Sequence, residues 1–265
     1  MEIASMAADR VQRFAQAAMM AGAVIAGSGL AMAPGPVHAG DRALSPVQEE
    51  AVRTLVREFI LQNPEVMLES LRAHQARAEA EGREQAQAAV ADARDRLENN
   101  PMSPVAGNPD GDVTVVEFFD YNCGFCRRVV PDIQAHLAAD GNVRYVFKEF
   151  PILGQESVDA ARAALAVFIL DPEAYLPFHM ALMQSRGTIG RTKALEVAAE
   201  MGIDPVQLED AMADPRIDAA LRSNLELARQ IDIRGTPAFV IGDEVVPGAV
   251  GLDTLEELVA TARGS

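Results

Sequence analysis

The sequence predicts an α/β domain preceded by a separate helical region. Two apolar, β-rich runs over residues 113–119 and 143–147 flank a helical segment, and this order predicts a strand–helix–strand unit. Helical sequence over residues 156–231 follows, and residues 238–262 predict a strand hairpin and a closing helix. Residues 41–100, in contrast, carry only helical patterns.

Length, composition and charge limit the class of protein. A chain of 265 residues, 49% of them hydrophobic, can form a substantial core in one domain with an additional region, or in two domains. Its formal net charge is −16. Nucleic acid and anionic membrane surfaces are bound by positive charge, so we expect neither as a partner.

Residues 1–39 are typical of a signal peptide. Arg10 and Arg13 precede an apolar run over residues 15–33, and residues 37–39 form an A-x-A-like cleavage site. We therefore expect cleavage after Ala39 and export to the periplasm. The alternative is a retained N-terminal membrane anchor, which the short, glycine-interrupted run disfavours.

Residues 40–71 predict two short amphipathic helices that associate with copies of the same chain. Ser45 is the expected cap of the first helix, and Asn63-Pro64 separates it from the second. The first helix carries apolar residues at helical spacing, namely Val52, Leu55, Val56, Phe59 and Ile60. Two such helices cannot bury an apolar face alone. We expect self-association, with docking onto the same chain or onto another partner as alternatives.

Residues 72–102 predict a solvated helical linker. The segment is rich in Ala, Arg, Glu and Gln, and apart from alanine its only aliphatic residues before position 99 are Val90 and Leu97. Pairs such as Glu79 and Arg83 have the i,i+4 spacing of helical ion pairs. Such a run is more typical of a spacer than of a binding site.

Residues 103–265 predict the α/β domain. We expect a loop over residues 104–111, and then a buried central strand over 113–119 that leads into a helix over 126–138. Helix caps or breaks are expected at Ser157, Asp171, Asp204 and Asp214. Lys148 and Glu149 follow the second strand and are expected to be either an edge-strand charge pair or a proton relay.

The two cysteines of the chain, Cys123 and Cys126, lie three residues apart at the end of the predicted central strand. A C-x-x-C disulfide closes too small a loop to stabilise the fold much, so redox chemistry explains the pair better. Cys123 falls at a helix N-terminus, where free N–H groups favour an anionic sulfur. It is the expected nucleophile, and Cys126 is the resolving thiol. Gly124 and Phe125 between them carry no charge, and Phe125 offers an apolar contact for substrate.

Metal binding is the competing interpretation of the cysteine pair. A structural zinc site needs four ligands, and the chain has no further cysteine and no histidines at ligand spacing. We therefore expect no metal and no cofactor other than the Cys123–Cys126 disulfide. Copper(I) capture by the two thiolates, or chaperone-like binding without turnover, stays open as an alternative of a different class.

The domain resembles the DsbA-like branch of the thioredoxin superfamily. The resemblance covers roughly residues 103–263 and rests on three motifs, namely residues 118–126 (FFDYNCGFC), 148–154 (KEFPILG) and 235–239 (GTPAF). It implies a thioredoxin fold with a helical insertion between its halves. It also implies that Thr236-Pro237 is a cis-proline pair that faces Cys123 and contacts substrate.

Residues 58–66 (EFILQNPEV) resemble the N-terminal segment of ScsC (suppressor of copper sensitivity C) proteins. Because some ScsC proteins trimerise there and act as disulfide isomerases, the resemblance implies a homotrimer. Gly124 after the first cysteine and Thr236 before the proline also resemble isomerase features. We therefore expect an isomerase or reductase of misoxidised or unfolded exported proteins, reduced by a DsbD-like membrane partner. The alternative is a DsbA-type dithiol oxidase that a DsbB-like partner keeps oxidised.

Overall fold

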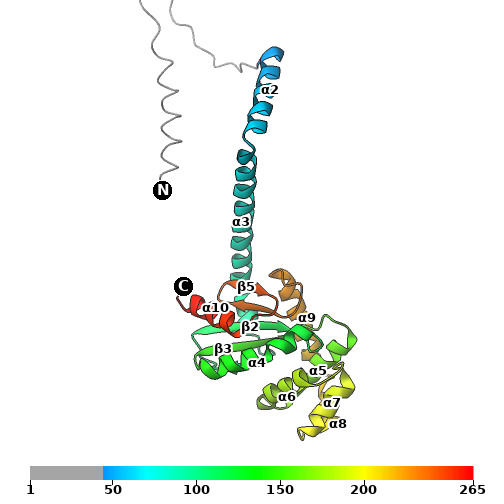
Figure 1. Cartoon of the computed structure of the whole chain (residues 1–265). Helices are drawn as coiled ribbons and strands as arrows, with labels where there is room; N and C mark the ends of the chain where they lie inside the picture. The colour runs from blue at the N-terminus through cyan, green and yellow to red at the C-terminus, as the bar shows by residue number, and fades with distance from the viewer. Residues whose placement is uncertain (1–43, 265) are drawn as a thin grey trace, which may run out of the picture. The chain divides into compact units, whose positions relative to one another are not determined.

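The computed structural model describes residues 44–264, so the predicted signal peptide lies outside the described residues. The chain divides after Pro64 into two compact units. The helices are α2 (Pro46–Gln62), α3 (Pro64–Glu98), α4 (Gly124–Ala139), α5 (Gln155–Leu170), α6 (Pro172–Gln184), α7 (Arg191–Glu200), α8 (Pro205–Ala211), α9 (Pro215–Gln230) and α10 (Leu252–Gly264) (Figure 1). The strands are β1 (Val105–Gly107), β2 (Val113–Phe119), β3 (Val143–Glu149), β4 (Ala238–Ile241) and β5 (Glu244–Pro247).

The five strands form one mixed sheet in the order β1-β3-β2-β4-β5. Strands β2 and β3 are parallel, with Val113 opposite Val143, and all other neighbours are antiparallel. The strand–helix–strand unit and the closing hairpin confirm the prediction. The expected loop over 104–111 was wrong at β1, whose three residues pair with β3. A strand of three residues is too short to show an alternating pattern in the sequence, so it is recognised only from its pairing with β3.

Strand β2 is buried on both faces, which explains its uninterrupted apolar sequence. Successive side chains of a strand point to opposite faces. Val115 and Phe119 belong to a large core shared with α4, α5, α6 and α10. Val116 and Phe118 belong to a second core on the other face, shared with α3 and α9. The central strand is therefore held between two helical layers.

The last turns of α3 are packed in the core of the second compact unit and are not a solvated spacer. Val90, Ala93 and Leu97 are at most 1% exposed and pack in the second core beside Phe118. Their spacing of three and four residues puts them on one helix face. The prediction of a solvated linker was wrong for this segment. Alanine is common on solvated helices, but Ala93 is a core residue here. The residues of α3 before Ala80 are exposed, in agreement with the prediction.

Two cations of β3 bind the C-terminal end of α3. The Lys148 Nζ donates to Arg96 O at 2.6 Å and to Ser103 Oγ at 2.8 Å, and the Arg144 Nη2 donates to Glu98 O at 2.7 Å. The last carbonyls of a helix lack intrahelical partners and carry partial negative charge, so positively charged donors stabilise them. Burial, with the nearby positive charges of Arg144 and Arg96, lowers the pKa of Lys148 to about 7.

Of the two alternatives for Lys148 and Glu149, the edge-strand charge pair was wrong. Strand β3 lies between β1 and β2, so it is not an edge strand. Because side chains alternate along a strand, Lys148 enters the α3 side of the sheet and Glu149 enters the other. Both side chains are buried, each with its own partners.

Most predicted helix starts are confirmed. Asp171, Asp204 and Asp214 each precede a proline and accept a hydrogen bond from the backbone N–H two residues later. Ser157 is the exception, since α5 begins after Gly154 and Ser157 is buried within the helix. None of the helices within residues 44–264 is long and apolar enough to cross a membrane.

Replacing Leu97 with alanine is expected to destabilise the second compact unit by about 2–5 kcal/mol, because it leaves a cavity in the second core. The free energy of unfolding is measured by urea denaturation. The matched control is Leu170→Ala, because Leu170 is 44% exposed at the end of α5. Equal, small effects of the two substitutions would show that α3 is only a spacer.

Candidate active site

The two cysteines lie where β2 passes into α4. Cys123 is the N-cap of α4, and its sulfur accepts a hydrogen bond from the Cys126 N–H at 3.4 Å. Its thiol donates to Thr236 O at 3.2 Å. Cys123 is only 6% exposed and Cys126 is fully buried, and both thiols are free. Cys126 lies deeper than Cys123, as the sequence predicted, but the expectation of an exposed Cys123 was wrong, because this side chain is itself buried.

Thr236 and Pro237 approach Cys123 from the loop before β4. The Thr236–Pro237 peptide bond is cis, as the sequence resemblance implied. Although 113 positions separate Thr236 from Cys123, β4 pairs with β2 and brings the loop to the active-site turn. The proline itself is buried, and Thr236 is partly exposed.

Gly124 and Phe125 form the exposed rim of the site. Phe125 is 54% exposed, and the guanidinium of Arg128 lies 4.8 Å from the centroid of its ring. A cation over an aromatic face is attracted by the ring electrons. The prediction that the dipeptide gives the site no charge holds for Gly124 and Phe125 themselves. The structure adds a positive charge from Arg128, one turn further along α4.

A buried carboxyl group lies in the core near the deeper cysteine. Glu117 is 1% exposed, and its Oε2 accepts a hydrogen bond from the Tyr145 hydroxyl at 2.8 Å. Burial raises its pKa to about 7, while the Tyr145 hydrogen bond acts in the opposite direction. Burial also raises the pKa of the Cys126 thiol, and the negative charge of Glu117 adds to this effect. Cys126 has to lose its proton to attack a disulfide, and Glu117 is a base with a suitable pKa.

Sequence reasoning missed Glu117. The available signal was a single acid inside the otherwise apolar strand 113–119. A carboxyl group inside a core costs free energy unless it is protonated or hydrogen-bonded. Such a residue in a strand that ends at a reactive thiol is therefore a candidate for proton transfer.

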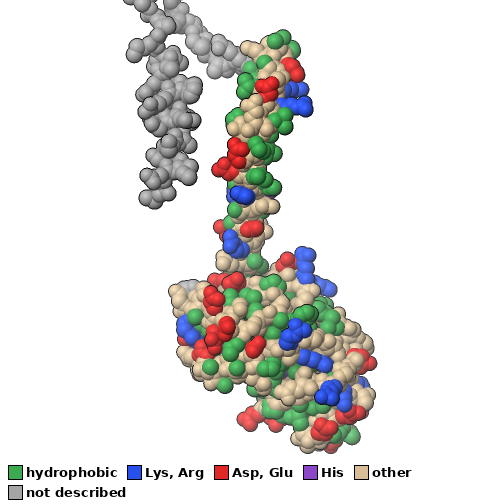
Figure 2. All heavy atoms as spheres, viewed as in Figure 1, with side chains coloured by type: hydrophobic (Ala, Val, Ile, Leu, Met, Phe, Trp, Pro, Cys, Tyr) green, Lys and Arg blue, Asp and Glu red, His purple; other side chains and the backbone are tan. Residues whose placement is uncertain are grey.

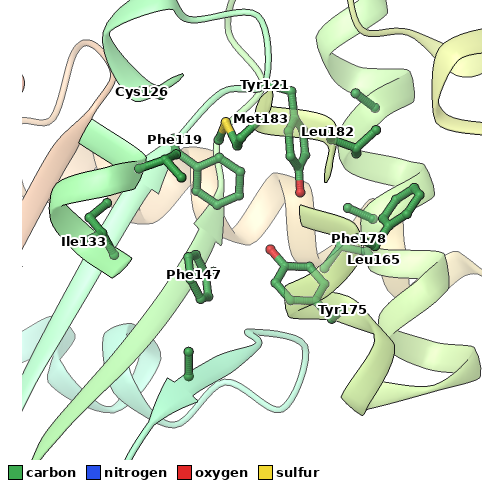
Figure 3. Packing of buried hydrophobic residues seen from close by; sticks show 14 of the residues in the cluster. Phe119, Tyr121, Cys126, Ile133, Phe147, Leu165, Tyr175, Phe178, Leu182 and Met183 are labelled. Carbon is green, nitrogen blue, oxygen red and sulfur yellow. The ribbon is translucent and has the colours of Figure 1, made fainter. Parts of the chain in front are cut away.

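A second buried carboxyl group joins the sheet to the helical insertion. Glu149 Oε1 accepts hydrogen bonds from the hydroxyls of Tyr121 and Tyr175, both at 3.0 Å, and these hydroxyls point toward each other across the core (Figure 3). The Tyr121 hydroxyl also lies 3.0 Å from His179 Nδ1. Burial raises the pKa of Glu149 and lowers that of His179 to about 3. At neutral pH His179 therefore carries no charge.

Asn122 fastens the active-site turn to the insertion. Its Oδ1 accepts from Ile189 N at 2.7 Å, and its Nδ2 donates to Ile189 O at 2.8 Å and to Ser157 Oγ at 3.1 Å. Asn122 directly precedes Cys123. The backbone position of the expected nucleophile is therefore tied to α5 and to the loop before α7.

Arg127 and Asp120 extend this connection. The Arg127 guanidinium donates to the carbonyl oxygens of Tyr121, Ser185 and Gly187 at 2.8–3.2 Å. Asp120 Oδ2 accepts from the backbone N–H groups of residues 152 and 153. These side chains hold two loops of the insertion against the first turn of α4. Their partners in these loops lie 32–60 positions away, so no local pattern predicts them.

The arrangement suits two-electron thiol chemistry. Within residues 44–264, no group of three or more His, Cys, Asp or Glu side chains could hold a metal ion. The site instead combines one sulfur at a helix N-terminus, a second sulfur one turn deeper, and a backbone carbonyl that contacts the first.

Comparisons with known proteins agree with this geometry. Residues 114–260 match the model of the DSBA-like thioredoxin domain, and residues 48–81 match the copper resistance protein ScsC N-terminal domain. The structure of a thioredoxin-like oxidoreductase from Silicibacter pomeroyi is 46% identical. The match covers 65% of this chain and 98% of that one, with a TM-score of 0.63. Proteus mirabilis ScsC in a transitional conformation is 34% identical, over 83% of this chain and 99% of that one, with a TM-score of 0.63.

Curated relatives are more distant. Disulfide bond formation protein D of Bacillus subtilis is 26% identical over 59% of this chain and 75% of that protein. The antiporter NhaA 1 of Salinispora arenicola is 25% identical over 61% of this chain, which spans only 26% of that longer protein.

The fold and the cysteine pair define a thiol–disulfide oxidoreductase of the thioredoxin fold. Within this class, the chain belongs to the DSBA-like thioredoxin domain family, and it carries an ScsC N-terminal domain before the catalytic domain.

Replacing Glu117 with glutamine is expected to change how stability depends on pH. Folded Glu117 keeps its proton up to about pH 7, whereas unfolded glutamic acid releases it near 4.5. The contribution of this group to stability is therefore fully present below pH 4.5 and is lost as pH rises through 7. Relative to the native protein, Glu117→Gln should gain as much as about 3 kcal/mol across this window.

The measurement is the free energy of unfolding by urea at several pH values for both proteins. The glutamine amide oxygen can still accept from Tyr145, so packing is preserved. Parallel pH profiles of the two proteins would refute the raised pKa.

Proposed function

We propose that this protein is a periplasmic disulfide isomerase or reductase that corrects wrong disulfides in exported proteins. The observation that carries the proposal is the position of the Cys123 sulfur, which contacts both the Cys126 N–H and Thr236 O at the N-terminus of α4. Free N–H groups there stabilise a thiolate, and the thiolate is the nucleophile in disulfide exchange. A periplasmic thioredoxin-like protein from Salmonella enterica, 36% identical over 65% of this chain, supports the location.

The reaction begins when the Cys123 thiolate attacks one sulfur of a substrate disulfide. The substrate S–S bond breaks, a mixed disulfide forms, and the released substrate thiolate takes a proton. In isomerisation, a substrate thiolate then attacks the mixed disulfide, so a new substrate disulfide forms and Cys123 returns to the thiolate with no net oxidation. In reduction, Glu117 accepts the Cys126 proton, and Cys126 attacks Cys123. The substrate leaves as a dithiol, and the Cys123–Cys126 disulfide remains.

The direction of net electron flow depends on a partner. Reduction oxidises the cysteine pair by two electrons, so a membrane dithiol donor of the DsbD type has to restore it. A DsbA-type oxidase would instead be reoxidised by a DsbB-like partner. The ScsC N-terminal domain at residues 48–81 supports the first direction. In both directions the redox-active disulfide is the only redox group that the reaction requires.

We assign substrate contact to Gly124, Phe125, Thr236 and Pro237. Phe125 presents an exposed ring beside Cys123, and a Cβ added at Gly124 would meet no atom within 4 Å, so substrate backbone can approach closely there. Thr236 supplies the carbonyl that contacts the Cys123 sulfur. Unfolded or misoxidised chains fit this exposed apolar rim.

We also propose a homotrimer formed through α2 and the first turns of α3. No residue of α2 is buried, and the side chains of Leu55, Phe59 and Leu68 are 51–69% exposed. Figure 2 shows hydrophobic side chains open to solvent on α2. Apolar surface of this kind indicates an interface with a protein partner. Self-association would bring several catalytic domains to one substrate.

The test of activity is the reactivation of scrambled ribonuclease by the mature protein. We expect reactivation by the reduced protein and its loss in Cys123→Ser, because the attacking sulfur is removed. Oxidation of reduced ribonuclease without unscrambling would identify an oxidase instead. Full activity of Cys123→Ser would refute the thiol mechanism and favour binding without turnover or copper capture.

The test of assembly is the light-scattering mass of the mature protein and of Phe59→Glu. We expect a trimer for the native chain and a smaller species for the variant, because the charge enters the apolar face of α2. Thr54→Glu is the matched control, since Thr54 lies on the opposite side of that helix and is exposed. A native monomer would refute the assembly. Removal of α3 is unsuitable, because Val90, Ala93 and Leu97 belong to the catalytic core.

A further inference from the structure

A groove of about 480 Å³ lies between α3, the segment before β4, and β5. It is on the side of the sheet that α3 and α9 cover, because Ile231, Ile233 and Ala238 belong to the second core. The residues that line it are Ala86, Ile231, Asp232, Ile233, Arg234, Gly235, Thr236, Pro237, Ala238, Val245, Pro247 and Gly248.

The groove is mainly apolar and carries no net charge. Its buried part is formed by residues such as Ile233 and Pro237, and Ala86 and Val245 are partly exposed beside it. Asp232 and Arg234 are its only charged lining residues, and they are paired with each other at 2.8 Å. The surface therefore suits an apolar segment rather than an anion or a cation.

The groove shares Thr236 with the surroundings of the reacting sulfur. Thr236 is a lining residue, and its carbonyl oxygen lies 3.2 Å from the Cys123 Sγ. A substrate cysteine joined to Cys123 in a mixed disulfide is therefore held next to Thr236. The substrate residues on one side of that cysteine therefore lie next to the apolar groove.

The α3 wall of the groove is fixed in place. Ala86 lies one turn before Val90 on the same helix face, and Val90 is 1% exposed in the second core. Lys148 and Arg144 bind the carbonyls at the end of the same helix. Because this part of α3 is already ordered, substrate binding does not have to order it, and the free-energy cost of association is lower.

The opposite wall favours an extended ligand. Strand β5 is the last strand of the sheet, so its outer edge has no strand partner within residues 44–264. An extended segment can pair its backbone with such an edge while alternate side chains enter a groove. A helix has no free backbone groups for this purpose.

We propose that this groove binds an extended apolar segment of the unfolded substrate, next to the cysteine that reacts with Cys123. Helix α3 is then part of the substrate-binding site, in addition to joining the N-terminal helices to the catalytic domain. The inference rests on the proposed thiol–disulfide exchange and names a subsite of that same reaction.

The experiment compares Ala86→Glu with Ala88→Glu in the full mature chain. Both positions lie on α3, but they are about 200° apart around the helix axis, and only Ala86 lines the groove. Each variant, in its reduced form, reacts with three disulfides of glutathione. In the first disulfide, glutathione is joined to a cysteine peptide with Leu and Val on both sides of the cysteine. In the second, it is joined to a cysteine peptide with Gly and Ser at those positions. The third is glutathione disulfide.

We expect Ala86→Glu to lower the second-order rate constant for the Leu/Val peptide by about tenfold, because one apolar contact is lost and a charge is buried. The rate constants for the Gly/Ser peptide and for glutathione disulfide should not change. Ala88→Glu should match the native protein with all three substrates.

Equal rate constants of native protein and Ala86→Glu with the Leu/Val peptide would overturn the proposal. A similar decrease with glutathione disulfide would also overturn it, because the substitution would then act on the cysteines and not on a peptide subsite. If Ala86→Glu changes the light-scattering mass but no rate constant, the groove is a contact between copies of the chain, and the proposal fails. Failure of the native protein to react with glutathione disulfide would instead refute the thiol mechanism itself.

Discussion

Burial of β2 on both faces is the constraint on which the rest of the structure depends. Each side chain from Val115 to Phe119 enters one of two cores, so the strand cannot shift by one residue without exchanging its faces. This register puts Glu117 in the core that contains Cys126. It also ends the strand at Asp120, whose carboxylate binds the backbone of two insertion residues. The position of Cys123 follows from a strand that has only one stable register.

Burial of the two central strands, β2 and β3, makes it costly to ionise Glu117, Lys148 and Glu149, and each side chain is stabilised by different partners. Lys148 is bound by a helix C-terminal carbonyl and a hydroxyl, Glu149 by two tyrosine hydroxyls, and Glu117 by one. Glu149 and Lys148 connect the sheet to α6 and α3, respectively, so they contribute to the specificity of the fold. Glu117 has fewer partners and a pKa of about 7, which leaves it able to exchange a proton near a thiol.

The two ends of helix α3 have different environments. Its first turns expose apolar side chains of the kind that associate with other chains, and its last turns are core residues of the catalytic unit. An N-terminal ScsC domain and a DSBA-like domain are therefore connected by a helix whose end is rigidly fixed. That fixed end also brings Ala86 to the groove beside Thr236, so the proposed assembly and the proposed substrate binding would share one structural element.

The sequence alone determined the features that depend on neighbouring residues. The C-x-x-C pair after a buried strand, the aspartate caps before prolines and the Ser45 cap of α2 all rest on contacts within four positions, so pattern and spacing predict them. The family resemblance supplied the cis peptide before Pro237. Tertiary structure decided which distant groups meet. Neither the pairing of β1, nor the connection of Asn122 to Ile189, nor the anchoring of α3 by Lys148 has a local signal. Each depends on chain segments more than 30 positions apart, and their contact is fixed only when the two cores pack.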